Sequence, residues 1–399
     1  MTRFILSLLS ALLLAATSWA AAVQVVPRGG NTAPAAAEEF ALSEAEFTQV
    51  YQTAIKEYRN KLRAYWPDAE VSGQSRYVTY SPDLRQKWVI DFQNNEMHIS
   101  LPTEYENNHV NYLSLRQKME LAVAGLLGTR IEQAVNQDPV NQALLQVAGI
   151  RYAQELGTAG KDLILEELFN EQNPSQQIIK NLADKLSKKA YIRYARVASI
   201  GPLALSSVEK TTFIVPLPAD RMQRKAERYK PYIYENAERF SLPADLIYAI
   251  IHTESSFNPL ARSQIPAYGL MQIVPHTAGK DAAQLITGKE KIFSPNYLYN
   301  PQKNIQLGSA YFYLLYYRYL KDIEDPQSRL YCAIAAYNAG VQNVMRTLTG
   351  QSSINRAEAS INRMNNKEVL RKLLRQMPNI ETREYLNKVL SLRRAYAQL

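Results

Sequence analysis

The sequence predicts an α+β fold, in which an N-terminal α+β accessory domain precedes a mostly α-helical domain. Two short runs of alternating apolar and polar residues flank Asn94-Asn95, which is typical of a β-hairpin. Apolar residues recur at helical spacing on both sides of this hairpin. A last strand-like run ends in Pro216-Leu217-Pro218, a typical linker sequence. We therefore expect an accessory domain over residues 41–216 and a second domain over residues 217–399.

Residues 1–20 have the features of a secretory signal peptide. Arg3 supplies a positive charge, residues 4–16 are apolar, and Ser18-Trp19-Ala20 is a small-x-small cleavage site. The apolar run is too short to span a bilayer. We expect a cleaved signal, followed by a flexible lead-in over residues 21–40, which are rich in Pro, Gly and Ala.

The accessory domain is predicted to open with a helix. Ser43 and Glu46 have the spacing of a capping box, and the apolar pattern that follows runs to Leu62. The hairpin comes next, with Trp88, Ile90 and Phe92 before the turn and Met97, Ile99 and Leu101 after it. The other predicted elements are a strand at 77–80, a mostly helical stretch at 112–186 and a strand at 211–217.

No metal or cofactor is predicted. Asp91, Glu96, His98 and His109 have a spacing that fits no metal-ligand template, so we expect solvated hairpin residues there. The single cysteine, Cys332, excludes a disulfide within the chain.

The chain is basic, with 46 Lys and Arg against 37 Asp and Glu and a formal net charge of +9. This balance is typical of proteins with an anionic partner. Nucleic acid is not expected as the partner of an exported protein, which leaves a membrane surface or an acidic polymer. The densest basic cluster, at residues 221–230, is either a solvated helix face or an anion-attracting surface.

A candidate acid, Glu254, ends the helix predicted from Ser241. Ser241 is the expected N-cap and Pro243 an early helical residue. Ile247, Ile250 and Glu254 then share one helix face. A carboxyl group on a buried face loses solvation when it ionises, so its pKa rises and it can donate a proton near neutrality. The alternative is a solvated acid at a helix end.

The sequence after Glu254 contains no second acid. No Asp or Glu occurs between Ser255 and Lys280. Glycosidases that hydrolyse their substrate usually place two carboxyl groups at the scissile bond. A site with one carboxyl group needs another nucleophile, and the substrate itself can supply it.

Residues 220–399 resemble the lytic transglycosylases with the soluble-lytic-transglycosylase, or goose-lysozyme-like, fold. The matching blocks are E-S-S-F-N-P at 254–259, Ser263, G-L-M-Q at 269–272, Asn300-Pro301 with Asn304-Ile305, A-Y-N-A-G at 336–340 and E-T-R-x-Y at 381–385. The resemblance implies a lysozyme-like catalytic domain that acts on the glycan strands of peptidoglycan.

The resemblance also implies a mechanism. Glu254 would protonate the oxygen of the β-1,4 bond between N-acetylmuramic acid (MurNAc) and N-acetylglucosamine (GlcNAc). The same carboxylate would then deprotonate the muramyl C6 hydroxyl, which attacks C1 and leaves a 1,6-anhydromuramyl end. No water, metal or cofactor is consumed. Glu381 would be a second acid in the substrate groove, unless an ion pair with Arg375 or Arg383 makes it structural.

Six further residues are expected to bind substrate. The Ser263 hydroxyl either holds an acetamido group or caps a turn, and Gly269 permits close backbone approach to a ligand. Met271 is either an apolar wall of the site or a core residue. Tyr337 ends an apolar run. Its phenol either stabilises charge on the sugar ring or is the solvent-exposed hydroxyl of an otherwise buried side chain. The full set is Ser263, Gly269, Met271, Gln272, Tyr337 and Asn338, with Glu381 as the acidic member.

The N-terminal region looks like the accessory domain of the C-type membrane-bound lytic murein transglycosylases. Relatives in that branch are outer-membrane lipoproteins, whereas this chain has no cysteine after the signal to carry a lipid. We therefore expect a free periplasmic protein without a stable membrane anchor, and the sequence identifies no protein partner. A second departure lies at Pro266 and Tyr268, where relatives often have smaller residues; it bears on the preference for glycan length and peptide substitution.

Two alternatives stay open at this point. One is a muramidase of similar fold that uses water. The other is a catalytically silent glycan-binding protein of the envelope, although such a protein would be expected to lack the acid or the G-L-M-Q and A-Y-N blocks.

Overall fold

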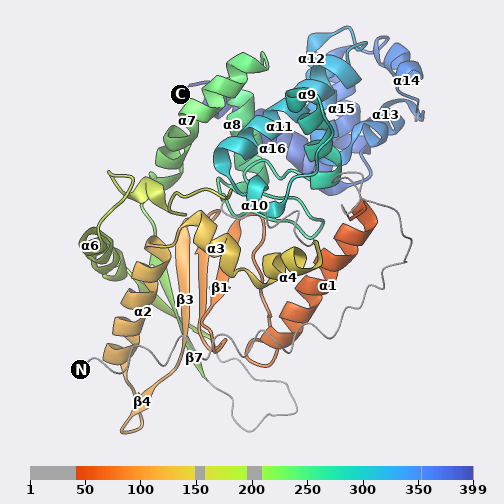
Figure 1. The fold of residues 1–399 in the computed structure, drawn as a ribbon. Coiled ribbons are helices and arrows are strands. Elements are labelled where there is room, and N and C mark those ends of the chain that lie inside the picture. Colours follow the sequence, from red (N-terminus) through yellow and green to blue (C-terminus); the bar gives the residue numbers. More distant parts are fainter. Residues whose placement is uncertain (1–41, 149–157, 196–208, 352, 399) are drawn as a thin grey trace, which may run out of the picture. The chain divides into compact units, whose positions relative to one another are not determined.

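The structure is a computed structural model that describes residues 42–148, 158–195, 209–351 and 353–398, and these belong to one compact unit. The predicted signal peptide and lead-in lie outside the described residues. Figure 1 shows an antiparallel sheet with its helices in the first half of the chain and an assembly of helices in the second half. The α+β fold class is therefore confirmed. No helix in the described ranges has the length and apolar character needed to cross a membrane.

An antiparallel sheet of five strands, in the order β1-β2-β3-β7-β6, is the centre of the accessory region. The hairpin is confirmed, because Ile90 pairs with Met97 around a turn in which Asn95 has a left-handed φ of 59°. A short hairpin, β4 with β5, and the strand β6 were not predicted. The strands are β1 (Arg76–Tyr80), β2 (Lys87–Asp91), β3 (Glu96–Pro102), β4 (Tyr105–Glu106), β5 (His109–Val110), β6 (Tyr191–Ala195) and β7 (Lys210–Pro216).

The expectation that Asp91 is solvated is wrong. Its side chain is buried, lies 3.4 Å from the Arg76 guanidinium and accepts hydrogen bonds from Asn94. Glu96 and His98 are half-buried and meet at 2.7 Å, whereas His109 is exposed, as expected.

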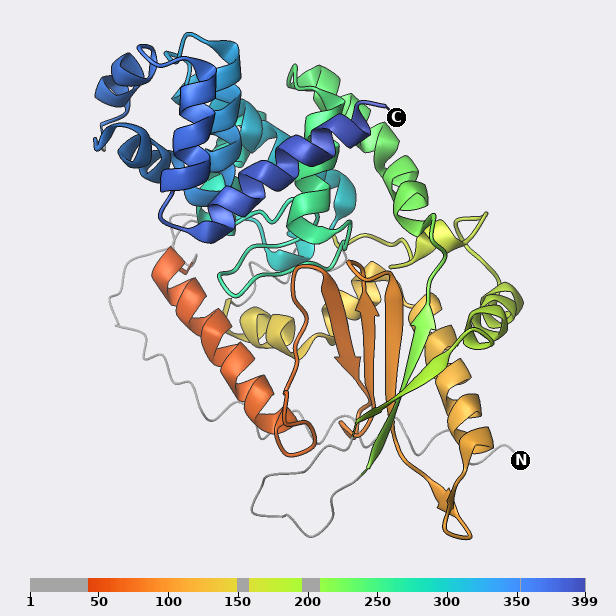
Figure 2. The same ribbon diagram turned by 180° about the vertical axis from the view of Figure 1, so that it is seen from behind.

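The first helix, α1 (Glu44–Leu62), is confirmed with its capping box: the Ser43 hydroxyl accepts from the Glu46 amide, and the Glu46 carboxylate accepts from the Ser43 amide. The predicted helical stretch at 112–186 is confirmed for its described part, where α2 packs on β3 and α6. Figure 2 shows α1 and α2 on opposite sides of the sheet. The remaining helices here are α2 (Tyr112–Leu127), α3 (Ile131–Gln137), α4 (Pro139–Ala148), α6 (Gln176–Ser187) and the 3₁₀ turn η1 (Glu166–Leu168).

The second region is helical throughout its regular elements. The aromatic run from Tyr311 to Tyr317 packs against the core, whereas Tyr319 is exposed. The elements are α7 (Arg221–Arg239), α8 (Ala244–Ser255), α9 (Lys280–Thr287), α10 (Pro295–Leu298), α11 (Pro301–Leu314), α12 (Pro326–Ala339), α13 (Val341–Thr349), α14 (Ile354–Ile361), α15 (Asn366–Gln376) and α16 (Ile380–Tyr396), with π-helical turns η2 (Pro275–Gly279) and η3 (Leu315–Tyr319).

The predicted N-cap of α8 is wrong by two residues. Ser241 has a left-handed φ of 51°, and Pro243 occupies the N-cap position with extended dihedrals and no side-chain cap. Proline cannot donate a backbone hydrogen bond, so it fits at a helix start, where the first amides lack helical partners.

Direct contacts join the accessory region to the loop that follows α8. The buried Arg262 side chain donates to the Asp138 carboxylate at 2.8 Å and to the Ser72 carbonyl at 3.2 Å. The Tyr51 hydroxyl of α1 donates to the Ser263 carbonyl at 2.6 Å. The sheet and its helices therefore hold this loop in place. The division at residues 216 and 217 into two functional domains stays a prediction.

Candidate active site

Glu254 lies in the last turn of α8, with its side chain on the buried face. Ile247 and Ile250 are each 1% exposed and Glu254 is 8% exposed, as the shared helix face predicts. Burial raises the pKa of Glu254 to about 8; the nearby charge of Glu381 adds to this, whereas Tyr385 and Lys388 oppose it. At pH 7 about nine-tenths of such a carboxyl group is protonated. It is therefore a proton donor at neutrality.

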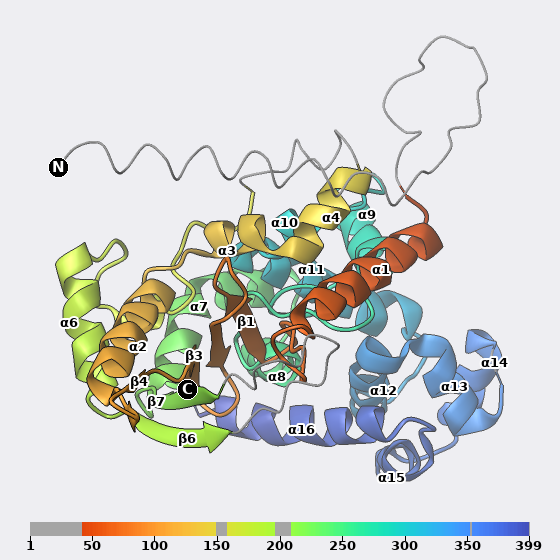
Figure 3. The ribbon, with the colours of Figure 1, turned by 90° about the horizontal axis from the view of Figure 1, so that it is seen from below.

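Two phenols stand beside this acid. Burial and the charge of Glu254 raise the pKa of Tyr337, on α12, and of Tyr385, on α16, well above the usual tyrosine value. The Tyr385 hydroxyl interacts with the Glu254 carboxyl but lies outside ordinary hydrogen-bond geometry, and no other group described in the structure pairs with it. Figures 2 and 3 show α16 lying along α8 and α12, which it contacts. Three helices thus converge on one carboxyl group.

The chain after α8 forms a tight loop that returns to the acid. Ser256 and Phe257 have left-handed φ values of 52° and 62°, which end the helix and reverse the chain. The Ser255 hydroxyl donates a hydrogen bond to the Leu270 carbonyl at 2.9 Å, which joins the end of α8 to the later part of the loop. Strained backbone of this kind often occurs at functional sites.

Gly269 and Asn304 fix the loop. Gly269 has a φ of +78°, and a Cβ atom there would lie 2.4 Å from both the Asn304 amide nitrogen and the Leu298 carbonyl oxygen. The Asn304 side chain donates to the carbonyls of Tyr268 and Leu298 at 2.8 Å and accepts from the Met271 amide at 2.7 Å. The block Asn304-Ile305 therefore matters because its amide replaces missing backbone partners of the loop.

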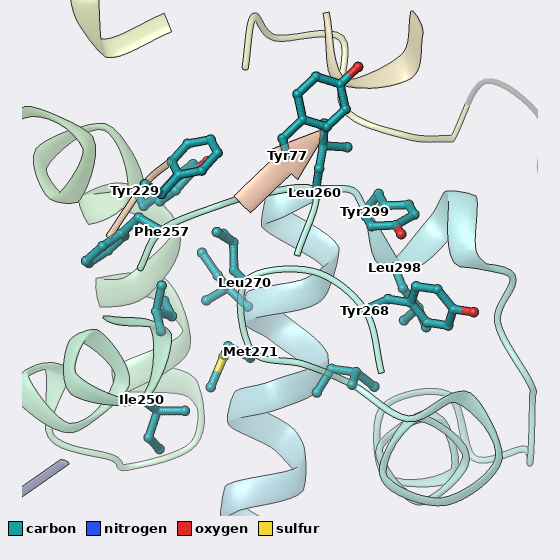
Figure 4. Close-up of a cluster of buried hydrophobic side chains, with 14 of the residues drawn as sticks. Tyr77, Tyr229, Ile250, Phe257, Leu260, Tyr268, Leu270, Met271, Leu298 and Tyr299 are labelled. Atoms are coloured by element: carbon teal, nitrogen blue, oxygen red, sulfur yellow. The ribbon is translucent and has the colours of Figure 1, made fainter. Parts of the chain in front are cut away.

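Met271 lies in the core. Its side chain is 0% exposed and packs against Gly308 of α11, where a Cβ atom would lie 2.4 Å from the Met271 sulfur. Figure 4 shows Leu270 and Met271 among the buried side chains beside Ile250. The Met271 carbonyl accepts a hydrogen bond from the Tyr337 hydroxyl at 2.8 Å. Met271 thus positions Tyr337, and its contact with a ligand stays a prediction.

Gln272 and Asn338 are the two amide side chains of the predicted site. The Gln272 side chain donates to the Gly269 carbonyl at 2.9 Å, and its own side-chain oxygen is buried with no partner among the described residues. Asn338 accepts from the Thr382 hydroxyl at 2.7 Å. The unpartnered oxygen of Gln272 is suited to accept a hydrogen bond from a ligand.

Ser263 and Glu381 lie at more open positions. The Ser263 hydroxyl donates to the Ile265 carbonyl and so caps a turn, as one of the two readings expected. Glu381 is exposed in the first turn of α16, and no ion pair with Arg375 or Arg383 occurs in the part of the chain described. Binding of substrate by either residue stays a prediction.

Two groups near the acid were not predicted individually. Tyr385 entered the sequence analysis only as the final residue of the E-T-R-x-Y block, and Lys388 was not considered. Residues 381, 385 and 388 are spaced i, i+4 and i+7, so they share one face of α16. That spacing was the available signal. The role of Asn304 had no local signal, because its partners lie on other segments.

Comparison with known proteins places the chain in a family. Residues 231–360 match the family described as the transglycosylase SLT domain. A membrane-bound lytic murein transglycosylase C from Pectobacterium atrosepticum is 31% identical over 374 residues, which cover 93% of this chain and 96% of that protein. One from Histophilus somni is 42% identical over 183 residues, which cover 46% of this chain and 50% of that protein.

Among solved structures, the soluble lytic transglycosylase SLT70 of Escherichia coli matches 72% of this chain and 34% of its own, with 19% identity and a TM-score of 0.35. The 31% identity to the Pectobacterium protein extends over nearly the full length of both chains. Together with the SLT match, it shows that this chain belongs to the membrane-bound lytic murein transglycosylase C family.

Proposed function

We propose that this protein is a peptidoglycan lytic transglycosylase that cleaves the MurNAc–GlcNAc β-1,4 bond without water and leaves a 1,6-anhydromuramyl end. The observation that supports this most directly is the buried carboxyl group of Glu254, whose pKa of about 8 keeps it protonated at neutrality. The family relationship supports the same conclusion, because its members are named for lytic action on murein.

In the first step, Glu254 donates its proton to the glycosidic oxygen. The C1–O bond breaks, the GlcNAc product leaves with that proton, and positive charge develops on the muramyl ring. Glu254 is then a carboxylate, which Tyr385 and the positive charge of Lys388 stabilise. Burial favours the protonated form of Glu254 before this step. Tyr385 and Lys388 then lower the free energy of the ionised form after it.

In the second step, the carboxylate takes the proton of the muramyl C6 hydroxyl. The freed oxygen attacks C1, the new C–O bond closes the anhydro ring, and Glu254 is again protonated. This attack is intramolecular, so orientation supplies much of the rate. Tyr337, held on the Met271 carbonyl, and the amides of Gln272 and Asn338 are the groups proposed to orient the ring. Ser263, Gly269 and Met271 complete the proposed substrate site, with Glu381 in the groove.

The competing chemistry is hydrolysis by an inverting muramidase, in which Glu381 activates a water. Glu381 is the other acid whose charge influences Glu254. It is exposed, however, in the first turn of α16. This favours a role in the groove.

Digestion of purified murein by the mature protein, followed by mass spectrometry, tests the proposal. We expect anhydro-ended products, which are lighter than hydrolytic products by one water. Glu254→Gln should abolish cleavage, whereas Glu381→Gln should slow it and leave the product unchanged. Reducing-end muramic acid, together with loss of activity in both variants, would show hydrolysis with two carboxyl groups. Binding without any product would show a silent glycan-binding protein.

We also propose that the protein works in the periplasm after cleavage of residues 1–20, because of the signal features of that segment. The accessory region is proposed to position the catalytic loop through Arg262 and Tyr51. Mass analysis of the native protein tests the location: a retained signal or an attached acyl chain would contradict it.

A further inference from the structure

A basic pocket lies between the exposed face of α1 and the loop after Ser263. Its volume is about 320 Å³. Most of the residues that line it from this helix come one position after a buried residue, so they flank the buried face of α1. The lining consists of Gln52, Ile55, Lys56 and Arg59 from α1, Arg63 at its C-cap, and Gln264 and Ile265 from the loop.

The lining of the pocket, as far as the structure describes it, is positively charged and includes no acid. Lys56, Arg59 and Arg63 line one wall, and none of them forms an ion pair within the described ranges. The nearby Asp138 is already paired with Arg262. Three cations in one concave site, with no compensating carboxylate from the protein, attract an anionic ligand.

The other wall belongs to the proposed active-site loop. Gln264 follows Ser263 directly, and Ile265 is 67% exposed although it is a large apolar residue. Tyr51, which directly precedes the pocket residue Gln52, donates its hydroxyl proton to the Ser263 carbonyl. A ligand in the pocket would therefore touch the same loop that the substrate site uses.

The size of the pocket limits the ligand. Sites for small ligands usually measure roughly 300–1,000 Å³, so this one takes a group of a few residues rather than a glycan strand. Murein carries short peptides with free carboxylates on its muramyl residues, and their small apolar side chains suit the exposed Ile265.

We propose that this pocket binds the carboxylates of the peptide stem on the muramyl residue, so that the enzyme recognises peptide-bearing glycan. This inference rests on the proposed function. It assigns Lys56, Arg59 and Arg63 to substrate recognition, away from the groups that move protons.

The test compares two substrates and two variants. The substrates are glycan strands with their peptide stems and the same strands after an amidase has removed the stems. The test variant, Lys56→Gln with Arg63→Gln, removes two exposed cations and leaves Arg59 near Tyr51 in place. The control is Lys61→Gln, which lies on α1 but does not line the pocket.

We expect the double variant to lose about tenfold in kcat/KM on stem-bearing strands, as two partly solvated ion pairs would predict, and to match the wild type on stripped strands. Lys61→Gln should match the wild type on both. An equal loss on both substrates, or no loss on either, would overturn the proposal.

Titration with the free stem tetrapeptide separates this proposal from the proposed function. The wild type should bind the peptide, and the double variant should bind it more weakly, even if no cleavage product forms. Absence of peptide binding by an active wild-type enzyme would overturn the pocket assignment alone. If the wild type instead bound vesicles containing anionic lipid as well as it binds the peptide, and the double variant did not bind them, the ligand would be a membrane surface.

Discussion

Replacing Glu254, the proposed catalytic acid, should stabilise the protein, and the gain should grow with pH. Glu254 has a pKa of about 8 in the folded chain, against 4.5 for the ordinary side chain. Below pH 4.5 it is protonated in both states and contributes nothing to pH dependence. Between pH 4.5 and 8 the unfolded chain loses the proton while the folded chain keeps it, so stability falls as pH rises. Above pH 8 both states are ionised and the loss is constant.

The size of the effect follows from the two pKa values. Each unit of pKa difference corresponds to about 1.4 kcal/mol, so the penalty at pH 7 is about 3 kcal/mol. Glu254→Gln keeps the shape of the side chain but cannot ionise, so it should recover most of this amount. The penalty is the energetic cost of holding a proton donor in a buried site.

Urea unfolding of the wild type and Glu254→Gln at pH 5, 6, 7 and 8 measures this directly. The difference in unfolding free energy should rise from about 1 kcal/mol at pH 5 to about 4 kcal/mol at pH 8. All other titrating groups cancel in the difference. Glu381→Gln, a change at an exposed acid, is the control and should show a small difference. A gap that stays constant with pH would refute the assignment of a raised pKa to Glu254.

Four further outcomes are expected. The rate of cleavage should fall as pH rises through about 8, because Glu254 must be protonated; a rate that climbs through this range would contradict its role as the acid. Tyr385→Phe should move that fall to higher pH and lower kcat, because the phenol stabilises the carboxylate; an unchanged pH–rate profile would show that the phenol does not act on the acid. Arg262→Gln should destabilise the chain by about 3 kcal/mol in urea, because it leaves Asp138 without its buried partner; a loss below about 1 kcal/mol would place the contact among ordinary surface pairs. Gly308→Ala should cost about 1–3 kcal/mol and slow cleavage, because its new methyl group displaces Met271, whereas Gly125→Ala, with open space around it in α2, should be neutral or stabilising.

Local patterns were enough to predict much of this molecule. The capping box of α1 and the alternation around Asn94-Asn95 depend on neighbouring residues, so the sequence alone identified them. The burial of Glu254 followed from its place on the apolar face of α8. Each of these features is decided within one element.

Features that depend on distant segments were not predicted. The edge strand β6 has exposed residues such as Tyr191 and gains its order from pairing with β7. The first turn of α8 was misplaced because Ser241 resembles an N-cap, whereas the chain turns there with a left-handed residue. The network of Asn304 joins three segments, so no local pattern could identify it.

The strand order of the sheet has a consequence for how the chain folds. β3 pairs with β7, and Glu96 meets Pro216, which lies 120 residues later (216 − 96). Closing so long a loop is entropically costly, and folds dominated by distant pairings form slowly. A nascent chain that ends before β7 presents β3 as an open edge, which is prone to pair with other chains. The last strand therefore sets when the accessory region can fold, and a fragment that stops short of residue 209 should aggregate whereas one that includes residue 217 should not.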